Sequence, residues 1–421
     1  MFAVAGLAVT SACSSSSGSD SPGSSAGAKP YTFHYPSWMW EEGDVGKWLK
    51  DRVAAFESDH STVTVQTTQI GVADYENQVS TQLSAGQAPD LMTAFTNQMP
   101  NLIENDLLAP LDSCFEGTDV MKRVLPTVSA VQRDGKTYGV PLTMSPQALV
   151  YNKELMDAAG VTSIPSTPDE LLDASRKIKQ ATGKFGYAVP TDTSDALQTY
   201  IESMKWILGY GSDWSSSDGT ITANADKNVE AIQTLKKFYD EDLTPKGMNE
   251  SDVLTLFAQG GAAFMIEGPW AMTQVQSDNP ELFPKIGFAP SPTPTHVAIT
   301  GGAFWAIPKD SAHFQDACDL LKINLEPDAQ RSWLENLLQI PGTTVQPSKE
   351  FLEKNPWVGE MADIAAKYPG GLGYAPPGYA VRAAEFQQIA VDSLAKVFAG
   401  SASVRDALDE AQANLTAKFG S

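Results

Sequence analysis

The sequence predicts an α/β fold that follows an N-terminal segment outside the folded body. From Tyr31 onward, short apolar runs alternate with amphipathic segments, which is the order typical of strands followed by helices. The chain has 421 residues, 42% hydrophobic and 19% charged, so it is long enough to bury one large core or two smaller ones. Its formal net charge of -22 is unfavourable for binding nucleic acid or anionic lipid, and it fits a neutral or cationic small ligand better.

The first predicted elements are a strand at 31–35 and a helix through Ser58, in which apolar residues recur at helical spacing. A strand-like run at 63–70 follows. Asp74 is expected to cap the next helix, which ends before Gly86. Farther along, Asp134-Gly135 is typical of a hairpin turn.

The clearest helix start is at 167–170, where a threonine that can cap is followed by proline and, three residues on, by Glu170. This helix should run to Gly183. Hydrophobic periodicity predicts further helices at 195–208, 225–242, 251–259, 312–325, 328–338, 380–399 and 403–419. Strand-like runs lie at 187–190, 262–266, 286–289 and 303–307. Helices and strands thus remain interspersed, and two lobes would require the chain to cross between them more than once.

Residues 1–12 are uncharged and mostly small or apolar, which is typical of a secretory signal peptide. Cys13 follows directly, and that order favours a bacterial lipoprotein whose cysteine receives diacylglycerol after cleavage. The alternative is an ordinary signal cut near Ala12. Residues 13–30 are rich in serine and glycine and are expected to form a flexible tether. We therefore expect an extracytoplasmic protein that reaches the outer face of the cell membrane by its lipid anchor only.

The folded body contains two further cysteines, Cys114 and Cys318. In an oxidising compartment two such thiols can pair, but a buried free cysteine is also common. The residues themselves leave both arrangements open.

No arrangement of residues supports catalysis or a metal site. The four histidines are scattered, without an HExxH motif, and there is no GxSxG elbow, Walker A loop or GxGxxG turn. The 51 acidic residues would allow a glycosidase pair, but the sequence nominates none. We expect a binding protein that is not an enzyme and needs no cofactor or metal.

Aromatic and polar residues instead follow three predicted strands, at 36–41 (PSWMWE), 95–98 (FTNQ) and 268–270 (GPW). In open α/β sheets ligands bind beyond the carboxyl ends of strands, so these loops are candidate walls of a site. An aromatic face can pack on the apolar C–H face of a sugar, although core packing is the alternative for any single tryptophan. Trp48 and Trp333, which lie on predicted helical faces, are assigned to the core.

At these loops the sequence resembles the extracytoplasmic solute-binding proteins of ABC importers, specifically the sugar-binding lipoproteins related to maltose-binding protein. The resemblance covers nearly everything after the tether. It rests on the order and spacing of motifs at 88–91 (APDL), 107–111 (LLAPL), 135–141 (GKTYGVP), 148–153 (ALVYNK), 260–270 (GGAAFMIEGPW), 301–308 (GGAFWAIP), 379–382 (YAVR) and 407–411 (ALDEA).

The resemblance implies a two-lobe periplasmic-binding-protein-like fold of type II, with hinge strands and a ligand cleft between the lobes. It places lobe 1 at 31–142 and 297–341, and lobe 2 at 143–296 and 342–421. Both cysteines of the body then fall in lobe 1, which keeps a disulfide possible. A monomer that delivers a sugar to the permease subunits of an ABC importer is the implied function.

The resemblance also nominates ligand contacts, residue by residue. Trp270 matches the stacking tryptophan of the family. Asn97 and Gln98 stand where maltose-binding protein has an aspartate and an arginine, and Gly378 stands where it has a second stacking tryptophan, so maltodextrins are disfavoured. For Arg382 the alternative is a salt bridge on a helix flank. The nominated residues are Trp38, Trp40, Glu41, Phe95, Asn97, Gln98, Ser145, Thr191, Asp192, Trp270, Gly302, Tyr379 and Arg382.

On this interpretation, the protein captures a sugar by shifting between open and closed arrangements of its lobes, and the sugar is expected to be an oligosaccharide. Two alternatives stay open at this point. One is a binding protein for a polyol or a glycerophosphodiester. The other is a secreted glycosidase with unrecognised carboxylates.

Overall fold

The computed structural model describes residues 29–125, 128, 131–194, 196–216, 218–297, 299–368 and 375–420. The predicted signal peptide at 1–12, the lipidation site Cys13 and all but the end of the tether therefore lie outside the described residues. In the part of the chain that is described, no helix has the length and apolar character needed to cross a membrane.

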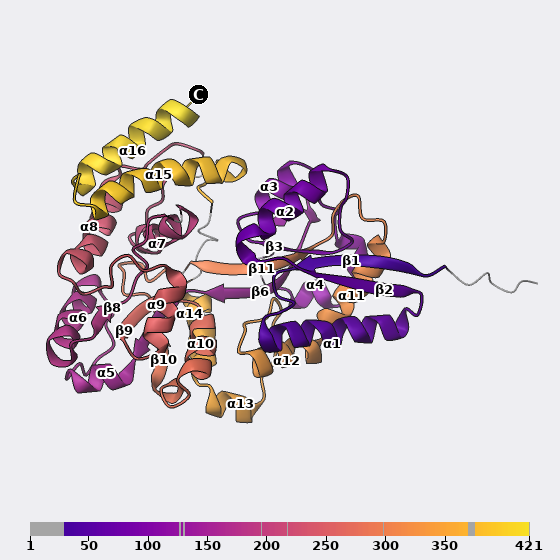
Figure 1. Ribbon diagram of the computed structural model, residues 1–421, viewed down its shortest axis with the longest axis horizontal. Coiled ribbons are helices and arrows are strands. Elements are labelled where there is room, and N and C mark those ends of the chain that lie inside the picture. Colours follow the sequence, from indigo (N-terminus) through magenta and orange to yellow (C-terminus); the bar gives the residue numbers. More distant parts are fainter. Residues whose placement is uncertain are drawn as a thin grey trace, which may run out of the picture.

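Two lobes with separate cores lie side by side and are joined by the long strands β6 (Val140–Pro146) and β11 (Thr300–Ala306) (Figure 1). Core residues of lobe 1 come from Phe33 to Met144 and from Ala303 to Leu337. Lobe 2 has two clusters, with residues drawn from 148–299 and 334–415. Helices and strands are mixed in both lobes, so the predicted two-lobe α/β fold is confirmed.

Lobe 1 contains two adjoining sheets. β1 (Tyr31–Ser37) pairs in parallel with β2 (Val63–Gln69). β3 (Met92–Phe95), β11 and β6 form an antiparallel sheet in that order. The carbonyl of His34 accepts from the N–H groups of Asp90 and Leu91, which join the first sheet to the second. The helices of lobe 1 are α1 (Gly43–Asp59), α2 (Val72–Ser84), α3 (Met99–Glu104), the 3-10 turn η1 (Asp112–Phe115), α4 (Val120–Arg123), α11 (Phe314–Asn324) and α12 (Pro327–Leu337).

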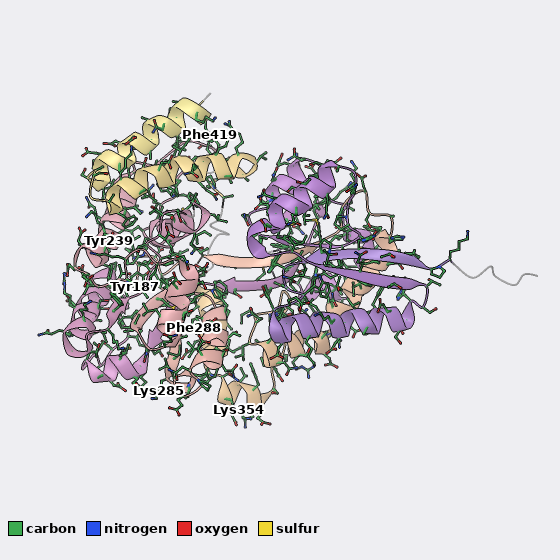
Figure 2. All side chains as sticks on the ribbon, viewed as in Figure 1. Tyr187, Tyr239, Lys285, Phe288, Lys354 and Phe419 are labelled. Carbon is green, nitrogen blue, oxygen red and sulfur yellow. A yellow bond between two sulfur atoms is a disulfide. The ribbon has the colours of Figure 1, made fainter. Side chains whose placement is uncertain are left out.

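Lobe 2 is built on a four-stranded sheet of order β10-β7-β9-β8. Its strands are β7 (Ala148–Asn152), β8 (Phe185–Tyr187), β9 (Ala262–Glu267) and β10 (Ile286–Ala289). All six residues of β9 are buried, because helices cover both faces of the sheet. Side chains fill the interior of this lobe, with Tyr187 and Phe288 among them (Figure 2). Its helices are α5 (Lys153–Ala158), α6 (Pro168–Thr182), α7 (Ala196–Gly209), α8 (Asp226–Asp240), α9 (Glu250–Ala258), α10 (Trp270–Asp278), η3 (Phe283–Lys285), α13 (Lys349–Lys354), α14 (Trp357–Lys367), η4 (Ala380–Arg382), α15 (Ala383–Phe398) and α16 (Val404–Phe419).

Local sequence signals gave mixed results at element ends. The cap at Thr167 is confirmed, since its side chain accepts from the N–H of Glu170 at 3.2 Å and α6 ends at Gly183 with φ of 70°. The hairpin at Asp134-Gly135 is also confirmed, between β4 (Gln132–Arg133) and β5 (Lys136–Thr137). The expected cap at Asp74 is wrong: α2 begins earlier, after Gly71, and Asp74 lies in its first turn. A carboxylate there still interacts favourably with the helix dipole, which explains why the residue suits either position.

The hinge consists of the segments that pass between the lobes near residues 147, 300 and 340. β6 and β11 pair from Pro146 opposite Thr300 to Val140 opposite Trp305. The third segment is held against them because the carbonyl of Ile340 accepts from the hydroxyl of Thr143 at 2.7 Å. At Gly302 an added Cβ would lie 2.2 Å from the backbone oxygen of Thr143, so only glycine permits this close approach of the two strands.

A disulfide joins Cys114 and Cys318 in lobe 1, with Cα atoms 5.1 Å apart. Cys114 lies in η1 and Cys318 in α11, and both side chains are buried. The bond therefore fastens the two chain segments of lobe 1 to each other. Lobe 2 receives no such cross-link within the described residues.

Candidate ligand-binding site

A cleft of about 990 Å³ lies between the lobes, and both lobes and the hinge contribute to its lining. The volume is at the upper end of the range typical of small-molecule sites, ~300–1,000 Å³. The residues that line it are Trp38, Met39, Glu42, Val45, Glu76, Asn77, Phe95, Thr96, Asn97, Thr143, Gln147, Leu197, Gln198, Ile201, Glu250, Ser251, Leu254, Trp270, Gly302, Ala303, Trp333 and Gln339.

The wall on lobe 1 is an aromatic stack. The ring of Trp38, in the loop after β1, lies parallel to that of Phe95, at the end of β3, with centroids 3.8 Å apart. Tyr75 of α2 meets Trp38 edge-on at 4.8 Å, and its hydroxyl donates to the carbonyl of Pro36 at 3.1 Å. Because loop, strand and helix hold these rings in place, this wall presents a rigid apolar surface with polar neighbours.

The wall on lobe 2 comes from the N-terminal parts of α7, α9 and α10. Trp270 is the first residue of α10 and is partly exposed to the cleft. Its ring lies against the backbone of Gly268, where an added Cβ would come within 2.1 Å of it. Glycine at 268 therefore allows the tryptophan ring to approach the preceding backbone closely.

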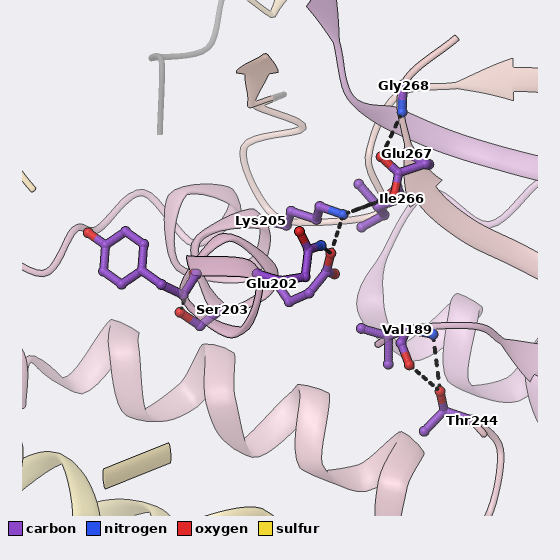
Figure 3. A network of polar contacts seen from close by, with 10 residues as sticks. Val189, Glu202, Ser203, Lys205, Thr244, Ile266, Glu267 and Gly268 are labelled. Atoms are coloured by element: carbon purple, nitrogen blue, oxygen red, sulfur yellow. Dashed lines mark hydrogen bonds and ion pairs between the residues drawn. The ribbon is translucent and has the colours of Figure 1, made fainter. Parts of the chain in front are cut away.

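Behind this wall lies a buried ionic network (Figure 3). The ammonium of Lys205 donates to Glu202 at 2.6 Å and to the carbonyl of Ile266 at 2.9 Å, and lies 3.5 Å from Glu267. Glu267 in turn accepts from the N–H of Gly268 at 3.1 Å, and Glu202 accepts from Gln198 at 2.9 Å. The network thus supports the loop that carries Trp270 and the cleft residue Gln198.

Electrostatics within the network are unbalanced, because two carboxylates share one ammonium. Burial alone would lower the pKa of Lys205, but attraction to Glu202 and Glu267 outweighs it and the pKa is raised. Burial raises the pKa of Glu202 to about 7, with Lys205 opposing and Glu267 adding to the shift. Near neutral pH Glu202 therefore exchanges a proton, which changes the net charge of the network by one unit.

The floor of the cleft is the hinge itself. Thr143 and Gln147 come from the first crossing, Gly302 and Ala303 from the second, and Gln339 from the third. The side chain of Gln147 is 3% exposed, and its Oε1 has no hydrogen-bond partner among the described residues. A ligand on this floor would touch every segment that must bend when the lobes move.

The chain matches a known protein family over most of its length. The family model of the bacterial extracellular solute-binding proteins matches residues 51–360. The chain belongs to this family. The family is one of binding proteins, so catalysis is not the activity of the cleft.

Named relatives of this solute-binding protein include the diacetylchitobiose binding protein DasA of Streptomyces coelicolor, 26% identical over 89% of this chain and 87% of the relative. The galactooligosaccharide-binding protein of Bacillus subtilis is 30% identical over 55% of each chain. Among solved structures, maltose-bound MalE3 of T. maritima superposes with a TM-score of 0.79 at 22% identity, covering 92% of this chain and 100% of that one. The last likeness concerns the fold alone.

Five of the residues nominated from sequence line the cleft of this solute-binding protein. They are Trp38, Phe95, Asn97, Trp270 and Gly302. They come from loops or strand ends on both lobes and from the hinge, and the structure brings them around one space.

Eight nominated residues do not line the cleft in this structure. Around the first two loops, Trp40 is buried with its Nε1 donating to the carbonyl of Tyr35 at 3.0 Å, and Gln98 accepts from the N–H of Phe95 at 2.8 Å. Glu41 is exposed and pairs with Lys50 at 3.1 Å. Each of these side chains is engaged in local structure, because residues adjacent along a loop point to different sides of it.

The remaining five lie in lobe 2 or on the hinge. Ser145 is buried on β6 and its hydroxyl has no partner among the described residues. The hydroxyl of Thr191 donates to Pro245, and the carboxylate of Asp192 accepts from the N–H of Ser194. Tyr379 donates to the carbonyl of Gly219, and Arg382 pairs with Glu385 at 3.1 Å, the alternative arrangement considered for it.

Sequence reasoning missed most of the polar lining. Glu42 directly follows the nominated Glu41, so loop position was a usable signal there. Gln198 and Glu250 stand at helix starts, where a polar residue carries no distinguishing pattern. Trp333 is in the core as expected, 1% exposed and 5.0 Å from the ring of Trp48, yet it also borders the cleft.

Among the described residues, the lining contains the carboxylates of Glu42, Glu76 and Glu250 and no lysine, arginine or histidine. Desolvation by the surrounding walls raises the pKa of Glu42, although the open cleft leaves the residue accessible to solvent. Within the described residues no group of three or more potential ligands could hold a metal ion. The site is therefore acidic, aromatic and rich in amides.

Proposed function

We propose that this extracellular solute-binding protein captures an oligosaccharide in its interlobe cleft and delivers it to an ABC importer. The observation that carries the proposal is the pairing of two aromatic platforms, Trp38 on Phe95 in lobe 1 and Trp270 in lobe 2, across one cleft lined by amides and carboxylates. Aromatic faces suit the C–H faces of sugar rings, and the polar groups suit their hydroxyls. Relatives named for galactooligosaccharide and diacetylchitobiose binding support the same class of ligand.

We also propose that the protein is a monomer anchored by a diacylglycerol on Cys13, at the outer face of the cell membrane. The order of signal, cysteine and serine-rich tether in the sequence supports this. Replacing Cys13 by serine should move the protein from the membrane fraction to the medium without changing ligand affinity. Retention in the membrane fraction would contradict the anchor.

The ligand class is tested by a thermal-shift screen against a panel of neutral oligosaccharides of different linkage. A ligand that binds only the folded state raises the unfolding midpoint, so a true ligand should do so in a saturable way. Tryptophan fluorescence should change with the same saturation, and chromatography should recover the sugar intact. A panel that leaves the midpoint unchanged would contradict the proposal, and release of shorter sugars would favour a glycosidase.

A further inference from the structure

The charged groups of the cleft all have the same sign. Glu42 and Glu76 belong to lobe 1 and Glu250 to lobe 2, so acidic groups lie on both sides of the space that a ligand would fill. The described lining contributes no basic side chain. Within the described residues, neither Glu42 nor Glu76 forms an ion pair.

Two basic residues already described, Lys205 and Arg382, do not offset this charge. Lys205, behind the lobe 2 wall, is enclosed by Glu202 and Glu267, so that group of three is neutral or negative as a whole. Arg382, nominated from sequence, is paired with Glu385 outside the lining. The net charge of -22 adds a long-range field of the same sign.

The cleft is also built to receive polar groups, independently of its charge. Gln147, at its floor, is almost fully buried, and its side-chain oxygen has no hydrogen-bond partner in the part of the chain that the structure describes. The aromatic platforms lie on opposite lobes around it. A hydrogen-bond donor on a ligand would satisfy the side-chain oxygen of Gln147.

We propose that the cleft selects its oligosaccharide by charge, binding a sugar that carries a protonated amine more tightly than its neutral counterpart and rejecting one that carries a carboxylate or phosphate. This inference rests on the proposed function. When the lobes close, Glu250 approaches the acidic groups of lobe 1, and like charges in a narrowing cleft oppose the movement. An ammonium between them removes that repulsion, donates hydrogen bonds, and so favours the closed state. An anionic substituent adds to the repulsion.

Two matched series of trisaccharides test the inference. The β-1,4 series comprises cellotriose and the two forms in which one of its glucose units is replaced by glucosamine or by glucuronate; the α-1,4 series comprises maltotriose and the two forms in which one glucose unit carries a 6-amino-6-deoxy group or a 6-carboxylate. Dissociation constants are measured by isothermal titration calorimetry at pH 6 in low salt. In any series that binds, the amine form should bind ~10-fold more tightly and the acid form ~10-fold more weakly than the neutral form, as expected for a single charge in a partly screened site. Raising the salt to 0.5 M should shrink both ratios.

Substitutions of single carboxylates show which of them produce the charge selectivity. Glu42→Gln and Glu250→Gln should each lower the ratio of neutral to amine dissociation constants by several fold, while Glu353→Gln on the exposed face of α13 makes the same change in net charge and should leave the ratio as it is. Equal affinities for amine, neutral and acid forms within threefold would overturn charge selection while leaving oligosaccharide binding intact. Failure of all six sugars to bind would also overturn it, because the cleft would then gain nothing from an amine. The neutral panel described above decides the proposed function separately.

Discussion

The two lobes support the same cleft by different physical means. The lobe 1 wall rests on stacked rings and neutral hydrogen bonds, such as that from the indole of Trp305 to the hydroxyl of Tyr35 at 2.7 Å, and a disulfide fastens the lobe's two segments. The lobe 2 wall rests on a buried ammonium between two carboxylates. Stacked rings and a covalent bond are indifferent to pH, whereas buried charges are not. Loss of the disulfide should therefore destabilise lobe 1 most, and loss of the charge balance around Lys205 should destabilise lobe 2 most.

The largest effect is expected from removing the disulfide of lobe 1. Its cysteines are 204 residues apart in sequence, and the chain-entropy model gives a stabilisation of about 5 kcal/mol for a loop of that length. The double variant Cys114→Ser/Cys318→Ser should lose several kcal/mol in urea unfolding followed by tryptophan fluorescence. Dithiothreitol should destabilise the wild type to the same extent and leave the double variant unaffected. A loss below ~1 kcal/mol would mean that packing alone holds lobe 1 together.

In lobe 2, the substitution expected to lower stability most is Lys205→Met. The substitution keeps the aliphatic stem but leaves Glu202 and Glu267 buried without a cation, which costs ~3–5 kcal/mol for a buried pair. Lys349→Met is the matched control, because its side chain is 92% exposed and its pair with Glu353 contributes under ~1 kcal/mol. Urea unfolding compares the two variants. Equal stabilities would show that the network contributes nothing to lobe 2.

The pH dependence of stability should come from the same network. The pKa of Glu202 is about 7 in the folded protein and 4.5 in its ordinary state, so the folded chain binds more protons than the unfolded chain between those values. Stability is then highest below the unfolded pKa and falls as pH rises through 7, by about 3 kcal/mol for a shift of this size. Glu202→Gln should remove most of that fall between pH 5 and pH 8 in urea unfolding. A Glu202→Gln profile parallel to wild type would assign the dependence to other groups.

Much of the fold followed from local sequence signals. Turn chemistry at Asp134-Gly135 and capping at Thr167 located element ends because those residues determine local conformation themselves. The six-residue helices α3 and α13 were not predicted, since they are too short to show a periodic pattern. The longer α14 was also missed, although its buried residues Trp357, Val358, Met361 and Ile364 do recur at helical spacing. β8 ends at Tyr187, three residues before the expected end at Pro190, because its partner β9 sets the register.

The candidate site was harder to predict, for a geometrical reason. The loops at Trp38, Phe95 and Trp270 were located by their position after strands, but which side chain of a loop faces the cleft depends on the backbone turn. Trp38 and Trp40 illustrate this, since one lines the cleft and the other packs on Tyr35 with ring centroids 4.9 Å apart. Residues of α7 and α9 reach the cleft only because lobe 2 is placed opposite lobe 1, and no local pattern encodes that placement.

The smallest and most specific effect is expected when the tryptophans of the two aromatic platforms are replaced one at a time. Trp270 is partly exposed at the start of α10, so Trp270→Ala should weaken affinity for the best sugar of the panel by ~2 kcal/mol, roughly 30-fold, with little loss of stability. Trp38 is 4% exposed and packed between Phe95 and Tyr75, so Trp38→Ala should lose affinity together with ~3–5 kcal/mol of stability. Calorimetric titration measures the first quantity and urea unfolding the second. Wild-type affinity in Trp270→Ala would make this tryptophan structural and leave ligand stacking to lobe 1 alone.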